Sequence, residues 1–417
     1  MKVLKYLVCL TTLTLMLAAT AASAAVRWVN VVGIATPPGS SCANPGYNSI
    51  QAAVTAAVAN DTVNVCAGVY NEQVAISKAL TVRGVEIGNN KASVIQPTDV
   101  TANSTSLTSG NPIAAIVLVA GAKVTLENLT VDGRDNGLAG CAPNLVGVYY
   151  RNGSGTANLM AVRNIKLGAG LGGCQSGLAI FVQADGIGGV AKVDVLNSSV
   201  HDYQKNGITA NETGTEVRIL NNQVSGFGPT PDIAQNGIQL GFGAKGSVET
   251  NSVINHIYSP CTSVTTCSDS STNILLYDAS NVSVKNNVLG KSQTHILLVS
   301  DAEFPADNNR IEQNTLLDAD VFDGVAIVDG NKNTVKSNLI ANSDESGIYL
   351  RGNNNIVDGN GINDTPCGVF KDTGTGNAIN ANNQFVNTTQ KVCTPPPSSV
   401  VTLNGLTGQP SRVQAVR

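Results

Sequence analysis

The sequence predicts an all-β protein, a right-handed parallel β-helix solenoid with a short N-terminal capping helix. Two observations predict this fold class: a short apolar segment recurs every 22 to 36 residues, and each repeat contains a second short strand. Periods in this range are typical of solenoids, in which each coil packs only on its neighbours. The recurring segments are VLNSSV (195–200), ILNNQV (219–224), VETNSV (248–253), VKNNVL (284–289), IEQNTL (311–316), VKSNLI (335–340), VDGNGI (357–362) and INANNQ (379–384).

The second strand of each repeat alternates apolar and small or polar residues, which indicates β-structure rather than a helix. Its copies are NGITA (206–210), NGIQL (236–240), NILLY (273–277), HILLV (295–299), GVAIV (324–328), GIYLR (347–351) and GVFK (368–371). Helical repeats would need apolar runs of about ten or more residues with a 3.6-residue period. Stacking such coils produces parallel sheets whose inward rows form one continuous core.

One position within the recurring segments supports the same alignment of the repeats. The fourth residue of the recurring segments is asparagine in seven of eight cases: Ser198, Asn222, Asn251, Asn287, Asn314, Asn338, Asn360 and Asn382. Asparagine tolerates the left-handed backbone of a sharp turn, and its amide can bond the next coil at the strand spacing of about 4.8 Å. The pattern predicts a structural asparagine ladder; a row of sugar-binding amides is the alternative.

Both ends of the chain lack the regular repeat. Residues 1–24 have the charged start, apolar run and small-residue cleavage site of a secretory signal peptide. Residues 25–60 form the predicted cap region, with a helix within 48–59, and residues 61–393 form the β-helix. Residues 394–417 are expected to be an end-covering or flexible tail. We therefore expect a secreted, periplasmic or cell-surface protein, with no integral membrane segment after signal removal.

Eight cysteines remain once the signal peptide, with Cys9, is removed, and an even number suits an oxidising compartment. Neighbours in sequence suggest the disulfides Cys42–Cys66, Cys141–Cys174, Cys261–Cys267 and Cys367–Cys393. The third of these would constrain the loop 259–271, which the longest repeat must expel. A metal cluster is the alternative, but only three histidines are present and no paired-cysteine motif lies near them.

The composition excludes some partners. Only 13% of the residues are charged, the net charge is −4, and no basic block occurs. A nucleic-acid partner is therefore not expected, because binding a phosphate backbone needs clustered cations.

The segment Asn48 to Gly84 resembles the start of pectin-lyase-like β-helix proteins, including the pectin methylesterases. It combines the expected cap helix with Gly68-Val-Tyr70-Asn-Glu72, which matches their G-x-Y-x-E motif. The motif is shared by many β-helix proteins, including periplasmic copper-maturation factors and surface proteins. The catalytic motifs of methylesterases, polygalacturonases, alginate epimerases and pectate lyases are absent. The resemblance thus implies the fold and a connection with carbohydrates, without implying methylesterase activity.

The outward side chains of the second strands form two rows on one face. One row is Thr209, Gln239, Leu275, Leu297, Ala326, Tyr349 and Phe370; the next is Asn211, Gly241, Tyr277, Val299, Val328, Arg351 and Asp372. Tyr277, Tyr349, Arg351 and Phe370 are the candidate substrate-binding residues, since aromatic rings can stack on neutral sugars. The face is unusually apolar for an exposed sheet, so the alternative is that inserted loops or another subunit cover it.

Three aspartates follow strands of this face: Asp278, Asp301 and Asp329. If the register holds, Asp278 and Asp329 lie two strand spacings, about 10 Å, apart, near the carboxylate separation of inverting glycosidases. Glu303, Asp318, Asp320 and Asp323 are expected to add acidity nearby. One carboxyl could protonate a leaving oxygen while another activates water. Ca²⁺ is an alternative ligand for these oxygens, and the bland alternative is that aspartate is simply a good turn residue.

These observations lead to the hypothesis of an exported β-helix protein that binds a polysaccharide and cleaves it, as a glycoside hydrolase or a polysaccharide lyase. No cofactor or metal is assigned, with Ca²⁺ as the alternative already named. The competing hypothesis is a non-catalytic surface or structural protein whose face contacts another protein, including a second copy of itself. The scarcity of basic residues favours a neutral ligand or a protein over a polyanion.

Overall fold

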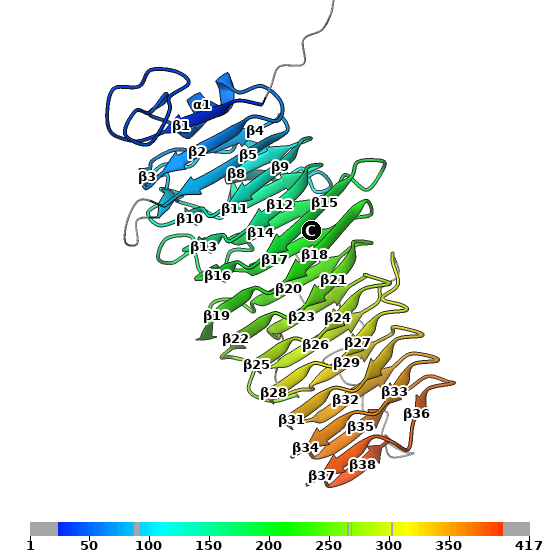
Figure 1. Cartoon of the computed structure of the whole chain (residues 1–417). Helices are drawn as coiled ribbons and strands as arrows, with labels where there is room; N and C mark the ends of the chain where they lie inside the picture. Colours follow the sequence, from blue (N-terminus) through cyan, green and yellow to red (C-terminus); the bar gives the residue numbers. More distant parts are fainter. Residues whose placement is uncertain (1–23, 87–91, 265–266, 268, 302, 395–417) are drawn as a thin grey trace, which may run out of the picture.

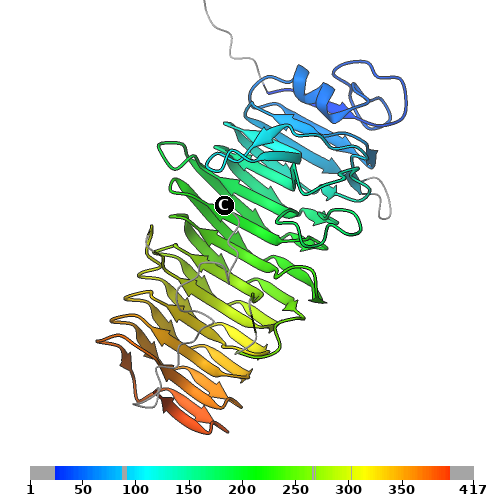
Figure 2. The same cartoon turned by 180° about the vertical axis from the view of Figure 1, so that it is seen from behind.

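The computed structural model describes residues 24–86, 92–264, 267, 269–301 and 303–394. The predicted signal peptide and C-terminal tail lie almost entirely outside the described residues. The chain winds as a right-handed parallel β-helix of three long sheets, so that each coil contributes one strand to each sheet (Figures 1 and 2). The predicted fold class is confirmed. Within the described part of the chain, no helix is long and apolar enough to cross a membrane.

The first sheet has 13 strands. In order they are β1 (Val26–Val29), β2 (Thr62–Cys66), β5 (Leu80–Val85), β9 (Lys123–Glu127), β12 (Ser154–Asn158), β15 (Ala191–Leu196), β18 (Thr215–Leu220), β21 (Lys245–Glu249), β24 (Ser283–Lys285), β27 (Arg310–Glu312), β30 (Thr334–Lys336), β33 (Ile356–Asp358) and β36 (Ala378–Ile379).

The second sheet has 12 strands. In order they are β3 (Gly68–Tyr70), β6 (Ser93–Ile95), β10 (Thr130–Asp132), β13 (Ala161–Arg163), β16 (Ser199–His201), β19 (Gln223–Thr230), β22 (Ser252–Tyr258), β25 (Val288–Ser292), β28 (Thr315–Ala319), β31 (Leu339–Ser343), β34 (Gly361–Asn363) and β37 (Gln384–Val386).

The third sheet carries the predicted face. From the C-terminal edge its strands are β38 (Gln390–Cys393), β35 (Cys367–Lys371), β32 (Ser346–Arg351), β29 (Val325–Val328), β26 (Thr294–Val299), β23 (Thr272–Tyr277), β20 (Asn236–Gly241), β17 (Asn206–Asn211), β14 (Leu178–Gln183), β11 (Asn144–Arg151), β8 (Pro112–Ala120) and β4 (Val74–Ile76). The short β7 (Ser104–Thr105) pairs antiparallel with β8. All other strand pairs are parallel.

The core is a stack of inward apolar rows, as the alternation in the sequence predicts. One row of the third sheet consists of buried β-branched residues: Ile208, Ile238, Ile274, Ile296, Val325, Ile348 and Val369. β-Branched side chains pack well on a pleated surface, and stacking identical positions buries each one against the coil above and the coil below. This regular stacking fixes the register of the outward rows.

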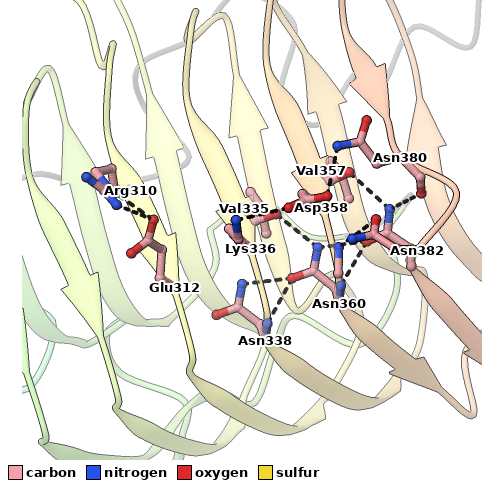
Figure 3. Close-up of polar contacts among 12 residues, drawn as sticks. Arg310, Glu312, Val335, Lys336, Asn338, Val357, Asp358, Asn360, Asn380 and Asn382 are labelled. Atoms are coloured by element: carbon pink, nitrogen blue, oxygen red, sulfur yellow. Dashed lines mark hydrogen bonds and ion pairs between the residues drawn. The ribbon is translucent and has the colours of Figure 1, made fainter.

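The asparagine ladder is confirmed at the turn between the first and second sheets (Figure 3). Asn338 Oδ1 accepts the backbone N–H of Asn314 at 2.9 Å, and Asn338 Nδ2 donates to Asn360 Oδ1 at 3.0 Å. The same contacts recur from Asn222 onwards, while Ser198 ends the ladder. The amides therefore satisfy buried backbone groups at the turn, which supports the structural interpretation over a row of sugar-binding amides.

Two details of the predicted ladder are wrong. Its last member is Asn383, which accepts the N–H of Asn360, because the final turn contains one more residue than the others. Asn382 is exposed, and its Oδ1 accepts the N–H of Gly359 at 3.2 Å. The left-handed residue is also the one before the ladder amide in the coils from Asn222 to Asn360, such as Asn286 with φ of 56°.

A second amide ladder was not predicted. Asn309, Asn333, Asn355 and Asn377 line the turn between the third and first sheets, and each accepts a backbone N–H from the coil before it at 2.8–2.9 Å. Their Nδ2 groups donate to backbone carbonyls. Two ladders therefore hold both corners that flank the first sheet.

The predicted capping helix is α1 (Ile50–Ala56), which covers the N-terminal end of the solenoid (Figure 1). The Glu72 carboxylate accepts the N–H groups of Ile50 and Gln51 at 2.7 and 2.8 Å. The buried Tyr70 hydroxyl donates to the Cys66 carbonyl at 2.8 Å. The G-x-Y-x-E motif therefore anchors the cap to the first coils, because a carboxylate at a helix N-terminus satisfies otherwise unpaired N–H groups.

All four predicted disulfides form: Cys42–Cys66, Cys141–Cys174, Cys261–Cys267 and Cys367–Cys393. The last joins β35 to β38, the edge strand of the third sheet. The third closes the loop between β22 and β23, where the longest repeat was expected to expel chain.

Candidate functional site

The outer face of the third sheet brings the predicted rows together in the expected register. Tyr277 lies opposite Val299, Val299 opposite Val328, and Val328 opposite Arg351. The other row runs without a shift from Thr209 to Phe370. All seven candidate site residues therefore lie on or beside one stretch of this face, between β23 and β35.

The exposure of this face differs from the expectation. Most of its apolar side chains are buried and form a hydrophobic cluster outside the main core, here called the apolar strip: Phe242, Leu275, Tyr277, Leu297, Ala326, Val328 and Tyr349, with the partly buried Val299 and Phe370. Leu275 is 0% and Tyr349 is 1% exposed. The aromatic rings are therefore not open platforms for a sugar, because their faces are already in contact with protein.

The aromatic residues of the strip pack on one another. The rings of Tyr349 and Phe370 stack at 5.7 Å between centroids, and Phe242 meets Tyr277 at 5.4 Å in a tilted arrangement. The hydroxyl of Tyr349 donates to Asp372 at 2.5 Å, and that of Tyr277 donates to Asp301 at 3.2 Å. Each tyrosine thus has its ring in the strip and its hydroxyl at the polar border of the strip.

Asp278 and Asp301 come together directly after β23 and β26. The side chain of Asp278 is buried, and its Oδ1 accepts the backbone N–H of Asp301 at 2.7 Å. Its Oδ2 is buried without a hydrogen-bond partner. Asp301 itself is exposed, and its Oδ1 accepts the N–H of Glu303 at 2.6 Å. A buried carboxyl therefore lies beside an accessible one.

The environment shifts the two carboxyl groups in opposite directions. Burial raises the pKa of Asp278 to about 7, and the negative charge of Asp301 adds to this rise. Although partial burial opposes it, hydrogen bonds from the N–H of Glu303 and from Tyr277 hold the pKa of Asp301 below its ordinary value. Near neutral pH, Asp278 therefore retains a substantial protonated fraction while Asp301 is ionised. Carboxyl pairs separated in this way can act as acid and base.

Asp329 does not join this pair. It lies two strands away from Asp278, and its carboxylate forms a bidentate ion pair with Arg351, at 2.9 Å to Nε and 2.7 Å to Nη2. The Arg351 side chain is only 10% exposed. Asp278 and Asp329 both have left-handed backbones, with φ of 57° and 59°. The left-handed turn explains why aspartate occurs at both positions. The ion pair with Arg351 explains why Asp329 does not contact Asp278.

The acidic residues that were expected near the site lie at two opposite edges of the sheet. Asp323 precedes β29, whereas Asp329 follows it, so the two lie at opposite ends of the strand. Asp323 is buried and accepts a hydrogen bond from the Ser346 hydroxyl. It lies close to Glu345, a residue that was not predicted from the sequence. Burial raises the pKa of Asp323 and raises that of Glu345 to about 7. Asp318 and Asp320 also precede β29, so of the four acidic residues expected to lie nearby, Glu303 alone lies beside Asp301 and Asp278.

The histidines do not form a metal site. His201 bonds Asp202 at 2.7 Å, while His256 and His295 are buried and linked through Asn273. Over the described ranges, no three histidine, cysteine, aspartate or glutamate side chains are placed to hold a metal ion. The Ca²⁺ alternative therefore gains no cluster of acidic side chains in this part of the chain.

A shallow hollow of about 730 Å³ lies on the outer face of the first sheet. Ion pairs line it, with Lys192 bound to Glu216 at 2.9 Å and Arg218 bound to Asp194 at 3.0 Å. Because opposite charges are paired across neighbouring strands, the hollow offers neither a charged patch nor an aromatic side chain to a ligand.

A family model described as "Periplasmic copper-binding protein (NosD)" matches residues 195–398. The comparison with curated protein sequences found no match. Similar solved structures include the GH136 lacto-N-biosidase from Eubacterium ramulus (12% identity, TM-score 0.54, 87% of this chain and 68% of that chain). PfbA, a surface adhesin of Streptococcus pneumoniae, is also similar (16%, TM-score 0.53, 84% and 88%).

The Dettilon tailspike protein is a further similar structure (14% identity, TM-score 0.55), and the chain spans 62% of its length while 78% of this chain is covered. At these identities the likeness shows the parallel β-helix fold. The periplasmic family match and the four disulfides agree with the predicted export, and the protein is extracytoplasmic.

The described residues do not fit a copper site. The eight cysteines from Cys42 to Cys393 are all in disulfides, which removes the thiolates that copper prefers. The ring nitrogens of His256 contact Tyr203 and Asn273. Met160 is buried in the core. The copper named in the family description therefore has no set of ligands in this part of the chain.

Proposed function

We propose that this protein binds a neutral or amino-sugar polysaccharide at the border of the apolar strip and hydrolyses it with Asp278 and Asp301. One observation carries the proposal: two adjacent carboxyl groups whose pKa values are driven apart, one buried and one exposed. Their positions at the ends of neighbouring parallel strands bring both to the same edge of the sheet. Acid and base functions assigned to two carboxyl groups are the basis of glycoside hydrolysis.

Each carboxyl has a distinct role in the proposed reaction. Asp278, protonated, donates its proton to the glycosidic oxygen as the bond between that oxygen and the anomeric carbon breaks. Because the two groups follow adjacent strands, about 4.8 Å apart, ionised Asp301 acts as the nucleophile and forms a covalent bond to the anomeric carbon as the glycosidic bond breaks. Asp278, now ionised, then removes a proton from water, whose oxygen displaces Asp301 from the anomeric carbon. The products are a free hydroxyl on one sugar and a new reducing end on the other, and both carboxyl groups return to their starting protonation states.

The charge around the site supports the choice of ligand class. The border of the strip carries Asp301, Glu303 and Asp329, and the nearby Arg351 is already paired. A polyuronate would bring more carboxylates to an acidic border whose Arg351 is already paired with Asp329, which is unfavourable. A neutral glycan avoids this repulsion, and a protonated amino sugar gains from it.

Among the proteins of similar fold, one is named a lacto-N-biosidase and another a surface adhesin. These names are compatible with a glycan ligand on a β-helix scaffold. They support the proposal only as examples of this fold, since function resides in the residues of a site.

The burial of Asp278 defines a condition for this activity. The side chain is 0% exposed, so a ligand can reach its Oδ2 only when neighbouring atoms are displaced. The proposal therefore includes an opening step before the chemistry.

The test is incubation of the mature protein with neutral, amino-sugar and uronate polysaccharides, with retention and new reducing ends measured for each. We expect Asp301→Asn to lower the rate at least 100-fold, because the nucleophile is lost. Asp194→Asn is the matched control, since it removes a surface carboxylate from the ion pair in the first-sheet hollow. Equal rates for Asp301→Asn and the parent would reject the assigned site.

A non-catalytic surface or structural role is the second candidate function. The packing of the apolar strip and the Asp329–Arg351 ion pair favour it, because both are features of a stabilised surface. This role predicts no new reducing ends from any glycan, together with retention on a partner protein or concentration-dependent self-association. Sedimentation of the purified protein over a range of concentrations separates the two candidates.

A further inference from the structure

A hollow that the proposed function does not use lies at the turns between the second and third sheets. Its volume is about 430 Å³, and its two walls come from the segments 166–172 and 227–233. These segments lie after β13 and at the end of β19, two strands that only β16 separates in the second sheet (Figure 1). The turn after β16 contains only residues 202–205, and Gln204 from this turn lines the hollow. A short turn between two longer segments thus leaves a depression, here called the loop hollow.

The wall on β19 presents an aromatic ring to the loop hollow. Phe227 is 41% exposed, whereas every other aromatic side chain in the described ranges is buried or half-buried. The register of β19 against β22 shifts between Ser225 and Gly228, so Phe227 lies in a β-bulge, a feature that redirects side chains. The fully buried Gln235 fixes this bulge, because its Oε1 accepts the Phe227 N–H at 3.0 Å. The ring is therefore held at the surface and does not pack in the core.

A second buried glutamine holds the opposite wall. Gln204 accepts the Leu167 N–H at 2.9 Å. Its Nε2 donates to the Leu171 and Cys174 carbonyls at 2.8 and 2.9 Å. The Cys141–Cys174 disulfide ties the same wall to the turn of the preceding coil. A ligand would therefore meet two walls that are already ordered, which lowers the entropic cost of binding.

The two walls approach each other at two points. The Lys166 ammonium lies 4.8 Å from the centre of the Phe227 ring. Asp232 comes so close to Gly172 that a Cβ on this glycine would lie 2.4 Å from the carboxylate. Lys166 and Asp232 are both exposed, and they are the two charged residues that line the loop hollow. The lining therefore combines one cation, one anion and one aromatic ring, without a net charge.

We propose that the loop hollow binds a neutral oligosaccharide, as a glycan site separate from the carboxyl pair. A sugar ring can place its C–H groups on the Phe227 ring, while its hydroxyl groups donate to Asp232 and accept from Lys166. A polyuronate would meet the Asp232 carboxylate, and a cationic glycan would meet the Lys166 ammonium, so the balanced charges favour a neutral ligand. The volume also lies within the range of small-molecule sites, about 300–1,000 Å³.

The loop hollow and the carboxyl pair lie at opposite edges of the third sheet. The walls of the loop hollow precede β14 and β20, whereas Asp278 and Asp301 follow β23 and β26. The inference therefore goes beyond the proposed hydrolysis and does not depend on it. A glycan bound in the loop hollow holds the protein on a polysaccharide, whether or not the chain is cleaved elsewhere.

The first test is calorimetric titration of the mature protein with cellohexaose, mannohexaose and N-acetylated chitohexaose, with hexagalacturonate as the anionic comparison. We expect at least one neutral hexasaccharide to bind and hexagalacturonate not to bind. Phe227→Ala should weaken the neutral binding at least about 10-fold, because the stacked apolar area is lost, and Phe227→Trp should retain it. Ile254→Ala is the matched control, since it removes another exposed apolar side chain from the neighbouring strand β22.

Three results of this titration would overturn the proposal. They are equal affinities for Phe227→Ala and the parent, tighter binding of hexagalacturonate than of the neutral probes, and no binding of any neutral probe. Phe227 is exposed, so its substitution should leave the thermal unfolding of the protein unchanged, and a loss of affinity then reports on the site.

The second test locates the bound glycan by hydrogen exchange and mass spectrometry. With the neutral hexasaccharide that binds most tightly, amides in 166–173 and 227–233 should exchange at least about 3-fold more slowly. Amides in 310–319, which contain β27 and β28, should be unaffected. Protection that is confined to segments outside the loop hollow would show that the glycan binds elsewhere and would refute the assignment.

The loop hollow and the hydrolase proposal fail in different ways. If neutral glycans protect the loop hollow and no new reducing ends form, the glycan site stands and the hydrolase proposal fails. If reducing ends form without protection of the loop hollow, the hydrolase stands and the additional site fails.

Discussion

Asp278→Asn tests whether the buried carboxyl resists ionisation. Asparagine suits the left-handed backbone at this position and keeps the oxygen that accepts the Asp301 N–H. Its amide replaces the protonated Oδ2, so the variant mimics the neutral acid at every pH. The substitution thus removes the ionisation of one group with little change in shape.

The magnitude follows from the pKa of Asp278, which burial raises from 3.8 to about 7. Above the pKa of the unfolded state, the unfolded chain loses this proton while the native state keeps it. The stability of the parent therefore falls as the pH rises from about 4 to about 7, and changes no further above that. A shift of about three units corresponds to at most about 4 kcal/mol, and relaxation around the charge makes the effect smaller.

The assay is guanidinium unfolding followed by circular dichroism at pH 5, 6, 7 and 8. We expect the loss of stability between pH 5 and 8 to be smaller in Asp278→Asn by about 2 kcal/mol, because about two of the three units lie between pH 5 and the pKa. Asp323 and Glu345, whose pKa values burial also raises, contribute a similar slope to both proteins and cancel in the comparison. Asp364→Asn, at an exposed left-handed position, is the control. Parallel curves for the parent and Asp278→Asn would refute the reasoning.

The same unfolding assay tests one prediction about the asparagine ladder and one about the N-terminal cap. Asn383→Ala leaves the buried Asn360 N–H without its acceptor and should cost about 1–3 kcal/mol, whereas exposed Asn382→Ala should cost less than about 0.5 kcal/mol. Equal costs would contradict the corrected ladder. Glu72→Gln weakens the contacts to the first turn of α1 and should cost about 1 kcal/mol, with faster amide exchange in that helix. Unchanged exchange would show that the carboxylate does not anchor the cap.

The sequence predicted the register because each coil repeats one local pattern. Inward positions such as Ile274 and Ile296 must be apolar, and this alternation fixes which side chains point outward. The disulfides followed for a related reason, since cysteines close in sequence lie on adjacent coils or in one loop. Local rules of this kind repeat along the whole solenoid.

The errors arose where the local pattern was ambiguous. Asn382 and Asn383 are adjacent asparagines, and only the extra residue in the final turn selects the second. The second ladder, with Asn333 and Asn355, lies outside the recurring segments that defined the repeat. A search for asparagine at a constant distance before the first-sheet strands would have found it.

The candidate site was predicted as a set of positions, and its chemistry depended on contacts between coils. The sequence placed Asp329 and Arg351 on adjacent strands without indicating that they form an ion pair. It likewise gave no sign that Asp278 is buried and Asp301 exposed, although both follow strands of one face. Such differences depend on which side chains meet across neighbouring coils.

The apolar rows on the outer face bear on how a β-helix of low charge avoids association with other chains. An uncovered strip of leucine, valine and tyrosine on an extended parallel sheet would favour association with other chains. The segment around β7 lies against the apolar cluster of β8, β11 and β14, and hydrogen bonds to Gln183 hold it there. It cannot be displaced without leaving buried polar groups unpaired, so this half of the face is firmly closed. The other half has a buried apolar cluster next to a carboxyl pair.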